Sequence, residues 1–311
     1  MIMTDWKIGI VTVMYNSAGV LEGFFDSLDR STYRNFVVYA IDNQSPDDSL
    51  LLAREHSART SFPTVIIEAE DNGGVAKGNN IGIRRALADG CDLVLLANND
   101  IEFTSESIAL LVEGLEKYDC DMIVPKIFNY FTGKLWAAGG GEYGFINPTT
   151  HFGYDQDDAP QYNEPRSLEF APTCFMLIKK EVFDKIGIMD ERYFAYFDDT
   201  DFVWRAVRQN GLKLHYEPEA VVQHKAGTSS GSKPSPFAFY LNTRNRAYFM
   251  NKYYPWHQRL CVNLYNFTYY FLYSVIHPSL PSIFKNFGYY REGLKMYRQW
   301  LAEQQPGQVQ K

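Results

Sequence analysis

Two short stretches of the sequence carry side chains that could do chemistry. In the first, LVLLANNDIEF (residues 93–103), Asn98, Asn99 and Asp100 directly follow an apolar run. Three polar side chains at the end of a buried strand have two explanations. One is a turn with a helix cap, which Asn and Asp both favour, and the other is a ligand or metal site. Asp100 suits a hard divalent cation, because such cations prefer carboxylate and phosphate oxygens.

The second stretch, YFDDTDF (residues 196–202), places Asp198, Asp199 and Asp201 within four residues. Helix capping and the helix dipole account for one or two acids at such a position. The third acid, and the aromatic residues that precede it, predict a general base beside a surface on which a sugar can stack. The aromatic residues are Tyr193, Phe194, Tyr196 and Phe197.

A single histidine, His224, ends an apolar run and precedes a Gly- and Ser-rich stretch in VVQHKAGTSSG. A lone histidine after a strand is usually structural. Its place before a flexible loop leaves metal ligation or phosphate contact open.

An alternation of strands and helices must position these groups. Strands are expected over residues 8–14, 36–42, 64–69 and 92–98. Helices are expected from about Ser17 to Leu28, after Pro46 and Asp47, and near Ile81 to Leu87, after the Gly-rich turn NGGVAKGNN. Leu21, Phe24, Phe25 and Leu28 mark one face of the first helix. Continuous apolar strands separated by helices predict a parallel sheet that is covered on both faces.

Polar residues collect after each of the four strands. In an open α/β sheet, ligands bind outside the carboxyl ends of the strands. The four clusters are Tyr15 and Asn16, Asp42 and Asn43, Asn72 to Asn79, and Asn98 to Asp100. Asp42 can accept the N3–H of a pyrimidine base, and the glycines of NGGVAKGNN permit close backbone approach and positive φ. Four clusters on one edge of a sheet predict a pocket there.

The composition excludes some classes of function. A net charge of −7 and a pI near 5.4 argue against a nucleic-acid binder, because such proteins neutralise phosphates. The aromatic share of 16% indicates stacking surfaces, a membrane-facing surface, or both. The four cysteines lie far apart and are expected to be reduced, buried thiols. No signal peptide and no run of 18 apolar residues is found, which predicts a cytoplasmic protein.

The composition changes after Gly231, where aromatic, Asn-rich and basic helical segments begin. The stretches FYLNTRNRAYFMNKYYPWHQRL and FKNFGYYREGLKMYRQW combine Arg and Lys with many aromatic residues. Such helices can lie in a membrane interface. The alternative is a helical subdomain or a dimer surface.

Several motifs, in order, resemble those of family 2 glycosyltransferases with the GT-A fold. They are VTVMYNS, VVYAIDNQSPDDS, DNGGVAKGNNIGI, LLANNDIEF, CFMLIKKEVFDKIGIMDERYFAYFDDTDFVWRAVRQNGLKL and AVVQHKAGTSS. They are most similar to the bacterial branch of rhamnosyltransferases and related enzymes of O-antigen and cell-wall glycan assembly. The resemblance covers roughly residues 8–230.

This resemblance implies an α/β fold with a Rossmann-like, mostly parallel sheet flanked by helices and a C-terminal helical appendage. Residues 1–231 would form the GT-A catalytic domain. Its nucleotide-sugar half would span about residues 1–127 and its acceptor half about residues 128–231. Residues 232–311 would form the aromatic-rich helical region.

The resemblance also implies roles for the polar residues. The nucleoside would be held by Thr12, Tyr15, Asn16 and Asp42, and the diphosphate would be lined by Asn72, Gly74 and Asn79. Asn98, Asn99 and Asp100 stand in place of the family's D-x-D motif. Because Asn replaces the first acid, metal binding would rest on Asp100 and His224.

The pair Asp198 and Asp199 matches the family's E/D-D pair, whose second member acts as the base. The implied reaction is therefore a direct inverting displacement in which Asp199 removes a proton from the acceptor hydroxyl. Trp204 and Arg205 lie on the following helix, and the family often has an Arg one turn after the base.

The implied cofactor is Mg²⁺ or Mn²⁺. The implied donor is a nucleotide diphosphate sugar, with dTDP-β-L-rhamnose as the first choice. UDP-galactofuranose and other UDP-sugars stay open, because Asp42 would read uracil and thymine alike. The acceptor would be a hydroxyl of a growing cell-surface glycan, free or lipid-linked. No nucleic-acid partner is expected, whereas peripheral contact of residues 232–311 with the inner face of the cell membrane and homo-oligomerisation are both open.

Two rival classes remain. A sugar nucleotidyltransferase would need a basic, Gly-rich signature after the first strand, and VMYNSAGV has no Arg or Lys. A non-catalytic glycan-binding protein would need no aligned acids, which the pair of Asp100 and Asp199 disfavours.

Overall fold

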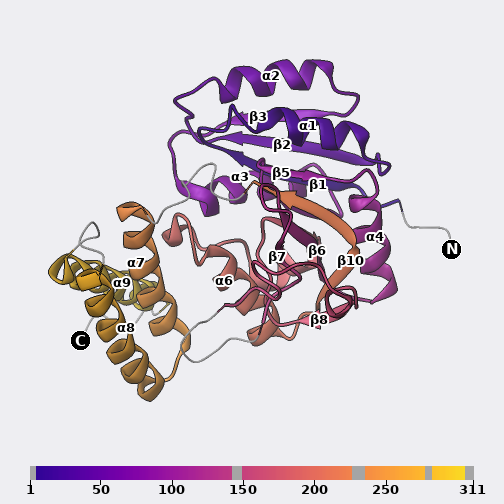
Figure 1. The fold of residues 1–311 in the computed structure, drawn as a ribbon. Helices are drawn as coiled ribbons and strands as arrows, with labels where there is room; N and C mark the ends of the chain where they lie inside the picture. Colours follow the sequence, from indigo (N-terminus) through magenta and orange to yellow (C-terminus); the bar gives the residue numbers. More distant parts are fainter. Residues whose placement is uncertain (1–4, 142–148, 226–234, 277–281, 305–311) are drawn as a thin grey trace. The chain divides into compact units, whose positions relative to one another are not determined.

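The computed structural model describes residues 5–141, 149–225, 235–276 and 282–304. Within these ranges the chain forms a ten-stranded sheet in the order β3-β2-β1-β4-β9-β6-β10-β5, with β7 beside β6 and β8 beside β10 (Figure 1). The strands are β1 (Ile8–Met14), β2 (Phe36–Asp42), β3 (Thr64–Glu68), β4 (Leu93–Ala97), β5 (Ile101–Phe103), β6 (Met122–Asn129), β7 (Leu135–Ala137), β8 (Arg166–Leu168), β9 (Phe175–Lys179) and β10 (Leu214–His224).

Helices cover both faces of this sheet. They are α1 (Leu21–Arg30), α2 (Ser49–Arg59), α3 (Gly74–Ala88), α4 (Ser107–Lys117), α5 (Lys180–Ile186) and α6 (Asp198–Val203). Apolar side chains of α1, α2 and α4 share one core cluster, and those of α3, α5 and α6 share the other. The expected face of α1 is confirmed, because all four of its large apolar residues are fully buried. The helix itself begins at Leu21 rather than near Ser17.

The α/β fold class is confirmed, and the sheet has a parallel part and a mixed part. The strands β3, β2, β1 and β4 are all parallel. Beyond β4 the sheet is mixed, because β9 runs antiparallel to both β4 and β6. The strand order reverses between β1 and β4. Ligands of open α/β sheets bind at the carboxyl ends of the strands at such a reversal.

The Gly-rich run NGGVAKGNN lies mostly inside a helix, which corrects the prediction of a turn before a helix near Ile81. Helix α3 begins at Gly74. A Cβ on Gly78 would lie 2.6 Å from Val13 Cγ1, and a Cβ on Gly82 would lie 2.3 Å from Val11 Cγ1. These glycines therefore let α3 pack closely on β1, a benefit that offsets their poor helix propensity.

The described residues divide into two compact units. The first contains the sheet and helices α1 to α6. The second contains residues 195–197 and the helices α7 (Pro236–Tyr253), α8 (Trp256–Ile276) and α9 (Ile283–Gln304). In the second unit α7 and α9 approach closely, because a Cβ on Gly293 would lie 2.2 Å from the Arg244 carbonyl oxygen. The boundary predicted at residue 231 lies outside the described residues.

None of the helices described is long and apolar enough to cross a membrane. All four cysteines are free thiols. Cys91, Cys120 and Cys174 are buried as expected, whereas Cys261 is exposed on α8, which corrects the prediction for that residue.

Candidate active site

The carboxyl ends of the first three strands lie side by side. Met14 pairs with Asp42, and Asp42 pairs with Glu68. Tyr15 and Asn16 follow directly after β1, where Tyr15 is exposed and Asn16 has a positive φ of 54°. The structure therefore brings the residues predicted after β1 and β2 to one edge of the sheet.

The side-chain amide of Asn43 joins the end of β2 to the start of α3. The sequence prediction gave Asn43 no specific role. Asn43 is buried, and its Nδ2 donates a hydrogen bond to the Gly74 carbonyl oxygen at 3.0 Å. Its Oδ1 has no hydrogen-bond partner among the described residues. A buried amide oxygen at a ligand-binding edge can accept a hydrogen bond from a ligand. The only signal in the sequence was the position of Asn43 beside Asp42.

Thr12 and Asp42, two of the residues predicted to hold the nucleoside, are both buried. Thr12 lies within β1, its side chain is fully buried, and its hydroxyl has no hydrogen-bond partner among the described residues. Asp42 is also buried, and its carboxylate oxygens are each 3.3 Å from the backbone nitrogen of Ser45. Asp42 is the last residue of its strand, so its carboxylate lies at the carboxyl edge of the sheet.

The start of α3 contacts the segment that leads to the acidic pair. Asn72 Oδ1 accepts a hydrogen bond from the Gly74 nitrogen at 3.2 Å. Gly74 has a φ of +84°, and a Cβ there would lie 2.2 Å from the Phe194 carbonyl oxygen. That oxygen accepts a hydrogen bond from the Val75 nitrogen at 2.6 Å. A helix N-terminus of this kind favours anions such as a diphosphate.

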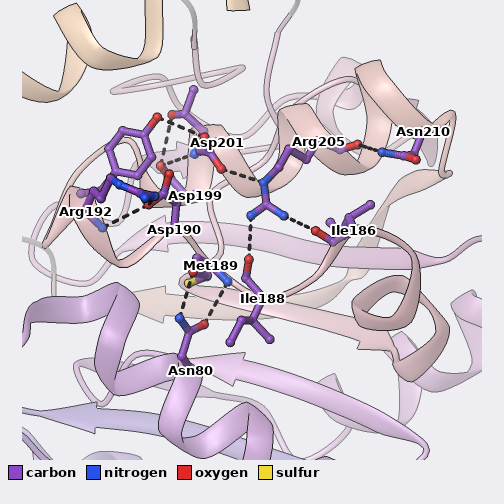
Figure 2. A network of polar contacts seen from close by, with 12 residues as sticks. Asn80, Ile186, Ile188, Met189, Asp190, Arg192, Asp199, Asp201, Arg205 and Asn210 are labelled. Carbon is purple, nitrogen blue, oxygen red and sulfur yellow. Dashed lines mark hydrogen bonds and ion pairs between the residues drawn. The ribbon is translucent and has the colours of Figure 1, made fainter. Parts of the chain in front are cut away.

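Two asparagines on α3 face the loop between α5 and α6. Asn79 is buried, and its amide nitrogen is 3.7 Å from Met189 Sδ. Asn80 exchanges two hydrogen bonds of 2.9 Å with the backbone of Met189 (Figure 2). It donates a third hydrogen bond to Glu191 Oε1. The sequence prediction named Asn79 but missed Asn80, which fixes α3 to the loop.

The three polar residues after β4 have different surroundings. Asn98 is exposed, and its backbone nitrogen donates to the Cys174 carbonyl oxygen at 2.8 Å. Asn99 is buried, and its Nδ2 donates to the Val13 carbonyl oxygen at 2.8 Å. The amide of Asn99 thus joins the turn after β4 to β1.

Asp100 lies beside His224. Strand β5 runs antiparallel to β10, so that Ile101 pairs with His224. Asp100 Oδ1 is 3.2 Å from His224 Nε2, and both side chains are buried. The two residues predicted to ligate a metal are therefore adjacent, although they are far apart in the sequence.

The imidazole of His224 packs against Trp136, a residue that the sequence prediction missed. The Trp136 ring meets it edge to face at 4.8 Å, and meets His151 in the same way at 4.5 Å. The Nδ1 atom of His224 has no hydrogen-bond partner among the described residues. Trp136 therefore fixes the plane of the imidazole while Nε2 stays directed at Asp100.

The donor set of Asp100 and His224 fits Mg²⁺ or Mn²⁺. No group of three or more His, Cys, Asp or Glu side chains that could hold a metal occurs in the described parts of the chain. Two protein ligands are nevertheless sufficient for these ions, because Mg²⁺ in nucleotide sites takes one or two carboxylates, and substrate phosphates and water complete its shell. Imidazole is a common ligand of transition metals.

The acidic pair opens α6. Asp198 is buried and Asp199 is partly exposed. Asp199 Oδ1 accepts hydrogen bonds from the nitrogen of Thr200 at 2.6 Å and from its hydroxyl at 3.2 Å. Among the described residues none donates to Asp199 Oδ2. That oxygen is the one that can accept a proton from a ligand.

Burial raises the pKa of Asp198 to about 8, and the negative charge of Asp199 acts in the same direction. Burial also raises the pKa of Asp199, against the opposing hydrogen bonds from Thr200. Burial raises the pKa of the nearby Cys174 thiol, and the charges of Asp100 and Asp199 raise it further.

We expect kcat/KM to fall as pH decreases, with the midpoint above the ordinary Asp pKa of 3.8, because Asp199 must be ionised to act as a base. The charge of Asp199 raises the pKa of Asp198, so Asp198 stays protonated while Asp199 ionises. Asp198→Asn replaces one neutral side chain by another and should therefore leave this midpoint nearly unchanged. A large shift of the midpoint in Asp198→Asn would show that the two carboxyl groups share the ionisation. Since the folded pKa values are raised, stability should fall as pH increases from the ordinary value to the folded one.

The third acid, Asp201, has a structural role (Figure 2). Its two oxygens accept hydrogen bonds from the Tyr193 hydroxyl at 3.1 Å and from Arg205 Nε at 2.8 Å. Arg205 also donates to the carbonyl oxygens of Ile186 at 2.5 Å and Ile188 at 2.8 Å. Arg205 therefore holds the end of α5 against α6, which continues as a π-helical turn over Trp204–Gln209.

Comparison with known proteins identifies the family. The family model described as Glycosyl transferase family 2 matches residues 9–187, which is more than half of the chain. The chain belongs to glycosyltransferase family 2. Like other members of this family, it acts on nucleotide sugars. The matched residues include the whole edge from β1 to the Asn98–Asp100 turn.

Family 2 relatives are similar over most of their length. The N-acetylglucosaminyl-diphospho-decaprenol L-rhamnosyltransferase of Mycobacterium tuberculosis is 24% identical over 257 residues, which cover 75% of this chain and 80% of the relative. The low-salt glycan biosynthesis hexosyltransferase Agl10 of Haloferax volcanii is also 24% identical over 257 residues, covering 77% of this chain and 74% of the relative.

The fold is that of GT-A glycosyltransferases. The mannosyltransferase PcManGT from Pyrobaculum calidifontis, solved in complex with GDP-Man and Mn²⁺, superimposes with a TM-score of 0.56. The two proteins are 12% identical, and the match covers 78% of this chain and 62% of that chain. At this identity the likeness shows the fold alone.

Proposed function

We propose that this family 2 glycosyltransferase is an inverting, metal-dependent enzyme that moves L-rhamnose from dTDP-rhamnose to a hydroxyl of a growing cell-surface glycan. One observation carries the proposal. Two acids have different surroundings, because Asp100 lies 3.2 Å from His224 Nε2, whereas Asp199 follows the buried Asp198 and accepts hydrogen bonds from Thr200 on one oxygen. One pair suits a cation and the other suits a proton acceptor. The similarity to a rhamnosyltransferase supports the choice of sugar.

In the proposed reaction, Asp199 Oδ2 takes the proton of the acceptor hydroxyl. The hydroxyl oxygen then forms a bond to the anomeric carbon while the bond from that carbon to the diphosphate oxygen breaks, which inverts the configuration. The N-terminus of α3 faces the departing diphosphate, and Asp42 accepts the N3–H of the base. Asp100 and His224 would hold the cation, which neutralises the negative charge of the leaving group when bound.

The proposal is tested by incubating the purified protein with a panel of nucleotide sugars and following release of the nucleotide diphosphate. Release from dTDP-β-L-rhamnose, enhanced by Mn²⁺ or Mg²⁺, is the expected result. A second candidate is a UDP-sugar-dependent galactofuranosyl- or hexosyltransferase, which similarity to the Haloferax hexosyltransferase favours. Release from UDP-sugars alone would select it. A sugar nucleotidyltransferase or a non-catalytic glycan-binding protein would release no nucleotide diphosphate.

We further propose that residues 232–311 contact the inner face of the cell membrane. No Asp, Glu, Lys or Arg occurs from residue 260 to residue 284. On α8, Leu260, Leu264, Leu272, Val275 and Ile276 are each more than half exposed. On α9, the exposed Arg291, Lys295 and Arg298 follow at spacings of four and three residues, so they share one helix face. Exposed apolar side chains and a basic face are what binding to an anionic bilayer surface requires.

Co-sedimentation with anionic liposomes tests this contact, and we expect the protein to pellet at low salt and to be released at high salt. Because each cation near an anionic surface contributes about 1 kcal/mol, replacing Arg291, Lys295 and Arg298 by Ala should weaken binding about 100-fold. Replacing Arg30, Arg34 and Arg59, which are exposed on the first unit, removes the same charge and should change binding little.

Protein that stays wholly in the supernatant at low salt would rule out the membrane contact. If such protein elutes as a dimer that Leu264→Asp dissociates, the apolar face of α8 belongs to a second copy of the chain.

A further inference from the structure

The segment directly before the acidic pair has an unusual backbone. Phe194, Tyr196 and Phe197 have φ values of +65°, +64° and +67°. Phe194 combines this φ with a ψ of −63°, a γ-turn geometry that is rare and strained. For bulky residues a positive φ is an outlier that persists only where the surroundings impose it. The chain continues from Phe197 directly into Asp198 and Asp199.

The buried side chain of Asn245 binds the middle of this turn. Asn245, on α7, is fully buried, and its Nδ2 donates to the carbonyl oxygens of Ala195 and Tyr196, each at 2.8 Å. Its Oδ1 accepts a hydrogen bond from Arg244 Nε at 2.9 Å. This third bond fixes which way the amide points, since only the NH₂ group can donate to two carbonyl oxygens.

The same helix packs against the end of the turn. The ring of Phe197 contacts the ring of Phe249 at 5.8 Å. Asn245 and Phe249 are four residues apart, so they lie on the same face of α7. One helix face therefore provides both the polar and the apolar contacts that hold residues 195–197.

The turn is also held where it begins. The Phe194 carbonyl oxygen accepts the 2.6 Å hydrogen bond from Val75 at the start of α3. Residues 195–197 thus lie between a fixed carbonyl group and the first residues of α6. A loss of the contacts from α7 would release the turn toward ordinary negative φ values. Such a change would rotate the backbone that carries Asp198 and Asp199.

We propose that Asn245 is a positioning residue for sugar transfer. It holds the strained turn of residues 195–197 and so sets the place of the Asp199 carboxylate. This inference rests on the proposed role of Asp199 as the base. A base must lie within hydrogen-bond reach of the proton it removes, and a misplacement of about 1 Å can cost about 100-fold in rate.

The experiment compares two asparagines of α7 in the full chain. Asn251 is also buried, but its Nδ2 donates to the Ala247 carbonyl oxygen of its own helix at 2.7 Å. Asn245→Ala should lower kcat about 10- to 100-fold and change the Kd of the nucleotide diphosphate with Mn²⁺ less than twofold. Asn245→Asp keeps the size but removes both donors, so it should resemble Asn245→Ala. Asn251→Ala should keep kcat near the wild-type value, whatever its effect on Tm.

Hydrogen–deuterium exchange gives a readout that does not depend on the donor sugar. We expect the amides of residues 194–201 to exchange faster in Asn245→Ala than in Asn251→Ala. Equal exchange of this segment in the two variants, or an equal fall in kcat, would overturn the inference. If the wild-type protein releases no nucleotide diphosphate from any donor, the proposed function fails, and the exchange result alone then decides whether Asn245 holds the turn.

Discussion

Asp199→Asn should slow sugar transfer by about two to four orders of magnitude, which is the usual contribution of a positioned base. The substitution is nearly isosteric, and the amide oxygen can still accept the two hydrogen bonds from Thr200. The start of α6 should therefore keep its conformation. An amide cannot take the proton of the acceptor hydroxyl, so the loss should fall on kcat. Binding of the nucleotide diphosphate with Mn²⁺ should stay largely intact.

Calorimetric titration of the nucleotide diphosphate, run beside a transfer assay, measures both quantities. Asp201→Asn is the matched control, because Asp201 lies two residues away but is fully buried and paired with Arg205. That control should lower Tm, since it weakens the ion pair. If Asp199→Asn transfers sugar at the wild-type rate, Asp199 is a helix cap and the base lies elsewhere.

Asp100→Ala should weaken metal-dependent donor binding and transfer together. Loss of an outer-shell partner of a bound metal already costs about 10- to 100-fold in affinity, and removal of a ligating carboxylate should cost at least as much. Strand β5 pairs with β10 from Ile101 to Phe103, so the substitution at Asp100 should leave this pairing unchanged. The variant should therefore fold normally.

His224→Ala provides the graded comparison for Asp100→Ala. It should raise the Mn²⁺ or Mg²⁺ concentration needed for half-maximal activity while leaving the far-UV circular dichroism unchanged. Activity titrations over a range of metal concentrations measure the effect. Unchanged metal dependence would assign His224 a structural role against Trp136, and a normal metal response in Asp100→Ala would remove the metal site from this edge altogether.

Local sequence patterns were sufficient for much of the fold. The apolar runs of β1, β2 and β4 are continuous and almost wholly buried, as expected for strands covered on both faces, and the buried face of α1 has helical spacing. Strand β3, at the edge of the sheet, is only partly buried. The polar residues after these strands could be assigned to one edge, because parallel strands end on the same side. The acidic pair was recognised by its motif, which is contiguous in the sequence.

The prediction was less accurate where one local pattern has two explanations. The glycines of NGGVAKGNN are typical of a turn, yet Gly78 lies inside α3, where the absence of a Cβ lets the helix approach β1. Cys261 was expected to be buried, and it is exposed on α8.

By itself, the sequence determined the family, the alternation of strands and helices, and which acids could do chemistry. Only the tertiary structure decided how those acids differ. The pairing of β5 with β10 brings His224 to Asp100, and Arg205 neutralises Asp201 while Asp199 keeps an oxygen available. Tertiary packing likewise brings Asn245 within hydrogen-bond distance of Ala195 and Tyr196. These contacts join residues that are distant in the chain. Periodicity and spacing describe only local structure. Which distant residues meet depends on how the packed elements are arranged.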